Sequence, residues 1–247
     1  MSDEQWQVIT GDCLEVMPTL APGSVDAILT DLPYGTTACS WDSVIPFAPM
    51  WAAIKHVLKP RGVFVTTASQ PFTSALVMSN VKWFRYEWTW NKNLAGNFLL
   101  AKHQPLKVHE NLCVFSANGH TYNPQMTKGV KRNKGGGKSK LWQLSLTTAT
   151  NDDYYPRSII DAPNTNRSVD HPTQKPVALY EYLIRTYTNE GELVLDMCAG
   201  SGTTGVAAIN TGRRVICIEQ REDYADIARA RIAKAAEQAR QLELPIQ

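Results

Sequence analysis

Short apolar runs recur along this chain of 247 residues, separated by polar segments and by turns that contain glycine or proline. The runs at Gln7–Thr10, Val25–Thr30 and Val63–Thr67 have the length of buried strands. Helical spacing of apolar residues appears between them, at Met50–Leu58 and Pro71–Ser79. Strands that alternate with helices predict an α/β protein with a mostly parallel sheet and helices on both faces.

The same alternation returns near the end of the chain. Glu87–Trp90 and Asn111–Phe115 are predicted as paired strands, and Val177–Thr188 as a helix. A terminal helix follows, with its apolar residues on one face: Tyr224, Ile227, Ala228, Ile232, Ala235 and Ala236. The whole chain, 1–247, is predicted to be one catalytic domain.

Two segments read as interruptions of this pattern. Lys59-Pro60-Arg61-Gly62 has turn chemistry and is expected to end the helix before it. Residues 117–169 have little periodicity and are rich in Gly, Pro, Asn, Ser and Lys. They predict an inserted region without sheet.

The charge of the chain is informative only locally. The net charge of +2 gives no global nucleic-acid signature, but Lys128–Lys140 holds basic residues and no acids. The segment is predicted to be mobile without DNA and to contact DNA phosphates, and a solvated surface loop is the alternative. The candidate phosphate ligands are Lys128, Lys131, Arg132, Lys134 and Lys138.

Cysteine and histidine usage argues against a metal site or a disulfide framework. The five cysteines are scattered, with no Cys-x-x-Cys spacing, and the histidines form no ligand pair. The polar N-terminus is unlike a signal peptide, and no apolar run approaches the length of a membrane span. A reducing, cytoplasmic location without membrane contact is expected, for a monomer or homodimer.

The most informative stretch is Asp31-Leu32-Pro33-Tyr34-Gly35, directly after the strand predicted at Val25–Thr30. Ligands bind at the carboxyl ends of strands in open α/β sheets. The Asp31 carboxylate and the Leu32 carbonyl can accept the two N–H bonds of an exocyclic amine, and the Tyr34 ring can stack on a base. Pro33 holds the preceding residue extended. Asp31–Tyr34 are therefore predicted to be the catalytic set.

A second motif, Leu193–Gly205, is an apolar strand followed by an acid, Asp196, and a glycine-rich turn. Arg213–Glu219 is the next strand and also ends in an acid. This βαβ unit predicts a nucleotide site in which the glycines allow close backbone approach and Glu219 binds ribose hydroxyls.

Together the two motifs resemble those of the S-adenosylmethionine-dependent DNA amino-methyltransferases. That family has Asp-Pro-Pro-Tyr as its catalytic motif and Asp-x-Phe-x-Gly-Ser-Gly-Thr-Thr as its cofactor motif. The catalytic motif comes first here, as in the β group of the family, and His171–Pro176 resembles a further hallmark. The resemblance implies a circularly permuted Rossmann-like fold, S-adenosylmethionine as cofactor and DNA as partner. It also implies that the insert at 117–169 is the target-recognition region.

The resemblance also implies a role for each matching residue. Asp196 would face the methionine end of the cofactor, Glu219 its ribose and Asp12 its adenine amine. Asp12 would reach that place because the permuted order sets the first strand beside Arg213–Glu219. The implied cofactor set is Asp12, Cys13, His171, Thr173, Lys175, Asp196, Gly200, Ser201, Gly202, Thr203 and Glu219.

Adenine N6 is the predicted target, because related cytosine N4 enzymes often carry serine where Asp31 stands. Cytosine N4 remains an alternative, since both amines need the same two acceptors. A nicotinamide-dependent oxidoreductase built on the glycine-rich turn is a third, which leaves Asp31–Tyr34 unexplained. Cytosine C5 methylation needs a Pro-Cys nucleophile, and no cysteine here follows a proline.

The last residues, Gln241–Gln247, follow the terminal helix and are expected to be extended, since Pro245 cannot continue a helix. They resemble the peptides with which bacterial replication proteins bind the sliding clamp. Gln241, Leu242, Leu244 and Ile246 would make that contact. The alternative is that Leu242 and Leu244 fold back onto the sheet.

Overall fold

The computed structural model describes residues 5–36, 42–134, 137–138, 145–146, 149–163 and 174–243. Its contacts divide the chain into two compact units, Met1–Asn123 with Ser158–Gln247, and Pro124–Arg157. The separate unit therefore lies inside the predicted insert, 117–169, and is shorter than it.

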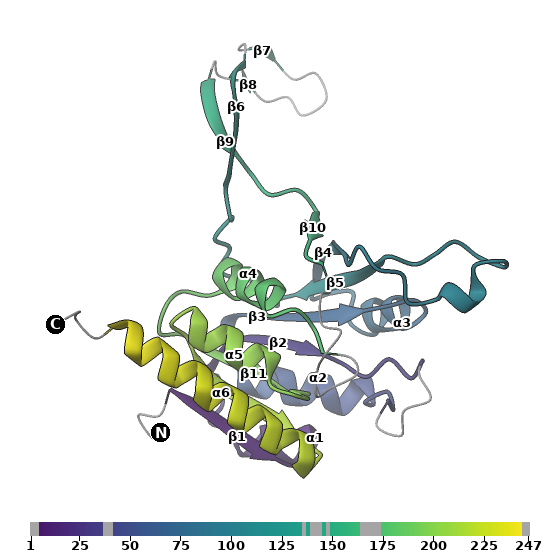
Figure 1. Cartoon of the computed structure of the whole chain (residues 1–247), viewed down its shortest axis with the longest axis vertical. Coiled ribbons are helices and arrows are strands. Elements are labelled where there is room, and N and C mark those ends of the chain that lie inside the picture. The colour runs from purple at the N-terminus through teal and green to yellow at the C-terminus, as the bar shows by residue number, and fades with distance from the viewer. Residues whose placement is uncertain are drawn as a thin grey trace. The chain divides into compact units, whose positions relative to one another are not determined.

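Within the described residues, a sheet of eight strands forms the centre of the larger unit (Figure 1). Its order is β1-β12-β11-β2-β3-β5-β4-β10, and β5 is antiparallel to both of its neighbours. The strands are β1 (Trp6–Thr10), β2 (Val25–Asp31), β3 (Leu58–Ala68), β4 (Phe84–Asn91), β5 (His109–Phe115), β10 (Ile159–Asp161), β11 (Leu193–Asp196) and β12 (Arg214–Glu219). The mostly parallel sheet predicted from the alternation is confirmed.

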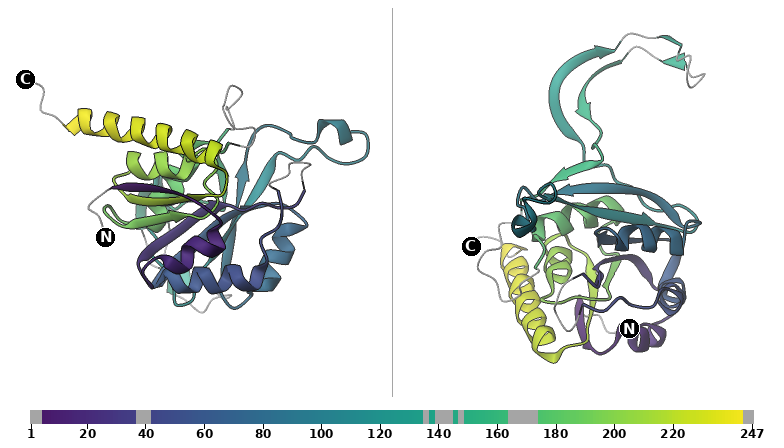
Figure 2. Two further views of the ribbon diagram at one scale, coloured as in Figure 1. Left: turned by 90° about the horizontal axis from the view of Figure 1, so that it is seen from below. Right: turned by 90° about the vertical axis from the view of Figure 1, so that its right-hand side faces the viewer.

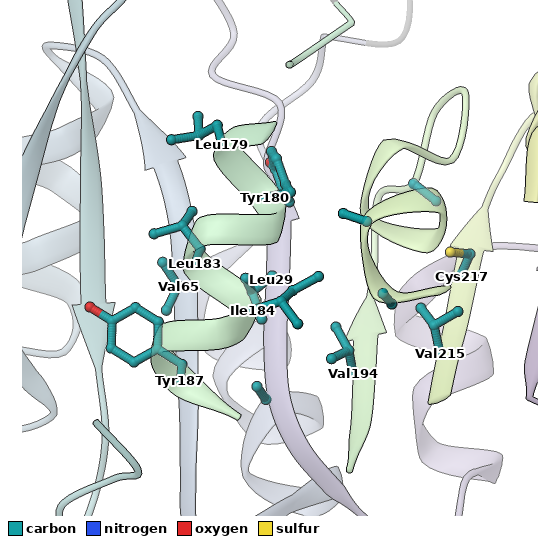
Figure 3. Packing of buried hydrophobic residues seen from close by; sticks show 14 of the residues in the cluster. Leu29, Val65, Leu179, Tyr180, Leu183, Ile184, Tyr187, Val194, Val215 and Cys217 are labelled. Atoms are coloured by element: carbon teal, nitrogen blue, oxygen red, sulfur yellow. The ribbon is translucent and has the colours of Figure 1, made fainter. Parts of the chain in front are cut away.

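Helices lie on both faces of this sheet (Figure 2). The α-helices are α1 (Cys13–Val16), α2 (Phe47–Val57), α3 (Phe72–Ser79), α4 (Val177–Tyr187), α5 (Thr203–Asn210) and α6 (Glu222–Glu243), with 3-10 turns η1 (Met17–Thr19) and η2 (Phe98–Leu100). Side chains alternate across a strand, so Leu29 and Val65 pack under α4, α5 and α6 (Figure 3). Ile28 and Phe64 face the other way and pack under α1, α2 and α3.

The first strand lies beside the last one in the sequence. β1 pairs with β12 in parallel, with Thr10 opposite Glu219, and β11 lies between β12 and β2. This is the permuted arrangement that the motif order implied, and it brings the ends of β1, β2, β11 and β12 to one edge.

The insert is not free of sheet, so that part of the prediction was wrong. β6 (Thr127–Lys134) and β9 (Ala149–Tyr154) form an antiparallel ribbon, and β7 (Gly137–Lys138) pairs with β8 (Ser145–Leu146). β10 joins the main sheet beside β4. Hydrogen bonds between strands need no apolar periodicity, which is why the pattern gave no signal here.

The predicted turn and the predicted tail also differ from the structure. Lys59–Gly62 lies within β3, because the strand begins directly where α2 ends. Gln241 and Leu242 belong to α6, and Leu242 is 88% exposed, so it does not fold back onto the sheet. Leu244 and Ile246 lie outside the described residues, and the clamp contact stays a prediction. No helix in the described ranges has the length and apolar character that crossing a membrane requires.

Candidate functional site

A cavity of about 390 Å³ opens where β1, β2, β11 and β12 end. Small-molecule and cofactor sites commonly have this size and this place in an α/β sheet. Ten of the residues predicted as site residues line it: Asp12, Cys13, Asp31, Pro33, Lys175, Asp196, Gly200, Ser201, Thr203 and Glu219.

The cavity is also lined by residues that were not predicted as site residues, among them Gly11, Leu14, Tyr180, Arg221 and Tyr224. Of the other predicted residues, Leu32, Tyr34 and Gly202 lie beside the cavity wall in sequence but do not line it. His171 and Thr173 lie outside the described residues.

Two acids stand at the β1 and β12 side of the cavity. The Glu219 carboxylate accepts hydrogen bonds from the backbone N–H of Gly200 (2.7 Å) and of Arg221 (3.0 Å). Asp12 accepts one from Leu14 N (2.8 Å) and so caps α1. Each carboxylate oxygen can accept more than one bond. Both acids therefore keep acceptor capacity toward a ligand with hydroxyl or amine groups.

The glycine-rich turn between β11 and α5 is shaped by packing as well as by the cavity. Gly200 and Gly202 have positive φ angles of 51° and 78°. A Cβ on Gly202 would lie 2.8 Å from Cβ of Ala228 on α6, so this glycine permits close helix packing. Its approach to a cofactor stays a prediction. Ser201 is tied to Gln174 and to Arg231 by hydrogen bonds of its hydroxyl.

Asp196, at the end of β11, is only 3% exposed. Its Oδ1 accepts from Thr30 Oγ1 (2.7 Å) and from Cys198 N (3.1 Å), and its Oδ2 accepts from Thr204 Oγ1. Burial raises the pKa of Asp196 to about 6, and these hydrogen bonds oppose that rise. The carboxylate thus holds β2, β11 and α5 together at the cavity floor.

Asp31 ends β2 at the opposite side of the cavity. Its Oδ1 accepts a hydrogen bond from the Tyr34 hydroxyl (2.9 Å) and another from Thr67 Oγ1 on β3. The Tyr34 ring stacks on Phe72, with ring centroids 5.4 Å apart. Burial, together with the charges of Asp31 and Glu110, raises the pKa of Tyr34 well above its ordinary value, so the hydroxyl remains a donor.

Lys175 lies against this carboxylate and not at the surface. Its Nζ is 2.6 Å from Asp31 Oδ2 and 3.6 Å from Glu110 Oε2, and its side chain is 11% exposed. The same Nζ is 5.9 Å from the centroid of the Tyr34 ring. The residue was predicted as part of the cofactor set, but in this structure its ammonium group binds the predicted catalytic residues.

Glu110, near the start of β5, and Lys92, just after β4, complete the network with an ion pair of 2.9 Å. Burial alone would raise the pKa of Glu110, but Lys175 and Lys92 hold it below its ordinary value. Sequence reasoning missed Glu110. Its place is set by the antiparallel pairing of β5 with β4, which puts Glu110 opposite Trp90 near the end of β4.

Among the predicted DNA ligands, Lys128 lies in the ribbon of the smaller unit. Its Nζ pairs with Asp153 (2.8 Å) and Asp152 (3.5 Å), acids contributed by β9. Lys128–Lys134 belongs to strand β6, so this part of the predicted loop Lys128–Lys140 is not a loop, and its mobility without DNA stays a prediction. Lys138 lies in β7, and Lys131, Arg132 and Lys134 lie in β6.

Comparison with known proteins adds sequence and fold relatives. A family model described as DNA methylase matches residues 25–230. The type II methyltransferase M.HpaI of Haemophilus parainfluenzae is 26% identical over 246 residues, which covers 92% of this chain and 74% of that protein.

Two solved structures share the fold. The M1.HpyAVI complex with S-adenosylmethionine matches with a TM-score of 0.64 and 25% identity, over 92% of this chain and 99% of that one. The cytosine-N4-specific PvuII DNA methyltransferase matches with a TM-score of 0.68 and 16% identity, over 96% and 93%. The family match argues against the alternative of a nicotinamide-dependent oxidoreductase. The chain belongs to the DNA methylase family, the S-adenosylmethionine-dependent amino-methyltransferases that its motifs resemble.

Proposed function

We propose that this protein transfers a methyl group from S-adenosylmethionine to the N6 amine of adenine in DNA. The observation that carries the proposal is the Asp31 carboxylate at the wall of the cavity, fixed by donors from Tyr34, Thr67 and Lys175. When bound, the cofactor supplies a methyl group on a positively charged sulfur. The chain has to supply a site for it and acceptors for the target amine.

The cavity suits this cofactor by its size and by its acids. Glu219 would accept hydrogen bonds from the ribose hydroxyls and Asp12 from the adenine amine, since both line the cavity at the β1–β12 edge. The backbone at Gly200 and Ser201 forms the adjoining wall. These roles follow from the position of the acids and from the oxygen atoms they present.

An exocyclic amine is a poor nucleophile because its lone pair is delocalised into the ring. Two acceptors held on its two N–H groups favour rehybridisation toward sp³, provided that they are positioned beforehand. Asp31 and the Leu32 carbonyl would be these acceptors. The base has to leave the duplex to reach them.

Entry of the base requires Lys175 to move. Its ammonium lies both on Asp31 Oδ2 and near the Tyr34 ring, so it stands where an amine-bearing ring would bind. Glu110, 3.6 Å from the same nitrogen, is an alternative partner within reach. We propose that Lys175 shifts toward Glu110 as the target amine takes over Asp31 Oδ2.

Cytosine N4 is the second candidate, because Asp31 and Leu32 would accept from its amine in the same way. The test is to incubate the protein with labelled S-adenosylmethionine and DNA of mixed sequence, digest the product and identify the methylated nucleoside by mass spectrometry. N6-methyladenine supports the proposal. N4-methylcytosine would replace it with the second candidate, and unlabelled DNA would contradict both.

A further inference from the structure

The loop between β4 and β5, residues 92–108, exposes several apolar side chains, and its first residue, Lys92, belongs to the network described above. Figure 1 shows it reaching away from the sheet beyond the ends of these two strands. Its exposed apolar side chains are Leu94, Phe98, Leu99, Leu100, Leu106 and Val108. Phe98 is 68% exposed and Leu99 is 83% exposed, and the η2 turn that carries them buries no residue.

The β4–β5 loop has a definite structure despite this exposure. The Asn97 side chain accepts a hydrogen bond from Lys107 N (2.7 Å) and donates one to the Pro105 carbonyl (3.1 Å). These bonds join the two sides of the loop. Leu100 N donates to Asn97 O (2.9 Å) and closes η2. These hydrogen bonds therefore fix the backbone that carries the apolar tip.

The base of the loop adjoins the catalytic network. Lys92 begins the loop and pairs with Glu110 at 2.9 Å, and Glu110 lies 3.6 Å from the Lys175 nitrogen that binds Asp31. At the other end, Lys107 donates to Ser69 at the end of β3. Both ends of the loop are thus anchored beside the network that includes Asp31, the residue that would bind the target amine.

Charge indicates the partner. The loop contains Lys92, Lys102, His103 and Lys107, and no acid occurs between Asn91 and His109. Basic side chains suit a phosphate backbone, and apolar side chains inserted between bases are a known means of opening a duplex. A second copy of the chain is a weaker fit, because a stable dimer buries about 800 Å² on each partner and this tip is a few side chains.

We propose that Phe98 and Leu99 insert into the DNA duplex beside the target base and hold the base stack open while that base is extruded. The inference rests on the proposed function and adds the surface that performs the extrusion. Lys102 and Lys107 would contact the flanking phosphates.

The test compares two double variants. Phe98→Ala with Leu99→Ala removes the tip, and Met78→Ala with Val81→Ala removes two other exposed apolar side chains, which are 73% and 55% exposed. Methylation by each variant is measured on a duplex that the wild type methylates. Extrusion is measured on the same duplex with a fluorescent analogue in place of the target base. Calorimetry with S-adenosylmethionine checks that each variant is folded.

The tip variant should lose at least about tenfold in extrusion and methylation with unchanged cofactor affinity, and the control should stay within about twofold of wild type. A mismatch at the target lowers the cost of extrusion, so it should restore most of the loss. Equal behaviour of the two variants would overturn the inference, as would a wild-type dimer that the tip variant converts to monomer. Failure of the wild type itself to methylate DNA would instead remove the proposed function.

Discussion

The ammonium nitrogen of Lys175 lies 2.6 Å from Oδ2 of Asp31, although the two residues are 144 positions apart in the chain. The same nitrogen is 3.6 Å from Glu110, so one cation separates two carboxylates. Burial opposes the charge on Lys175, but Asp31 and Glu110 raise its pKa above the ordinary value. Lys175 therefore stays protonated, and its positive charge offsets the repulsion between the carboxylates of Asp31 and Glu110.

Replacing Lys175 by Met should move the acid limb of the pH–rate profile for methyl transfer upward by about 1–3 units. Without the cation, Asp31 and Glu110 would share a site, and one of two neighbouring carboxylates then takes up a proton. Lys175→Arg keeps the charge and should move the limb less. Lys92→Met, which touches Glu110 and not Asp31, is the matched control. An unshifted limb in Lys175→Met would show that the pair has no electrostatic part in turnover.

Tyr34→Ala should weaken capture of the target base more than Tyr34→Phe does. The ring can stack on a base, a contact worth ~1–3 kcal/mol, whereas Phe loses only the hydroxyl that donates to Asp31. The measurement is the affinity of each variant for a duplex with an extruded analogue. Equal losses in the two variants would assign the contribution of Tyr34 to its hydroxyl.

Glu219→Ala should raise the dissociation constant for S-adenosylmethionine by at least about tenfold, with little change in DNA affinity. A charge-assisted hydrogen bond contributes about 1.5–3 kcal/mol, and Glu219 is placed to make such bonds to a ribose. Calorimetry measures the cofactor and fluorescence anisotropy the DNA. Glu222→Ala, an exposed acid at the start of α6, is the control. Unchanged cofactor affinity would remove Glu219 from the cofactor site.

Asp196→Asn should change how stability depends on pH. The folded-state pKa of about 6 exceeds the ordinary value of 3.8. Native protein therefore binds the proton more tightly than unfolded chain does, and this residue lowers stability as pH rises from about 4 to 6. Two pKa units correspond to about 3 kcal/mol. The unfolding free energy of the variant relative to wild type should rise by up to that amount across this window and stay constant above it. A flat difference would contradict the assignment, and Asp226→Asn on the surface of α6 serves as control.

Much of the site could be predicted because parallel strands place their carboxyl ends at one edge. An acid that follows an apolar run identifies Asp31, Asp196 and Glu219 in sequence alone, and the permuted order sets Asp12 beside Glu219. The network of Lys175, Glu110 and Lys92 could not be predicted in this way. The network depends on the antiparallel direction of β5 and on the contact of the Lys175 side chain with Asp31. Neither feature leaves a periodic signal in the sequence.

The ribbon of β6 and β9 was missed for a related reason. Its strands carry Lys, Asn, Thr and Asp, because a two-stranded ribbon has little core to fill, and period-2 apolar alternation is then absent. Gly202 has a role in packing that its place in the motif did not indicate. The motif predicts cofactor contact, and the nearby Cα and Cβ of Ala228 explain why no side chain fits there.

The most direct test of the central claim is the rate of methyl transfer in a single turnover for Asp31→Ala and Asp31→Asn, with S-adenosylmethionine and DNA both saturating. Loss of one preorganised acceptor costs at least about 10²-fold, so both variants should be slower than wild type by at least that factor while cofactor affinity by calorimetry is unchanged. A rate within about threefold of wild type in Asp31→Ala would contradict the account, because the target amine would then be activated without the Asp31 carboxylate.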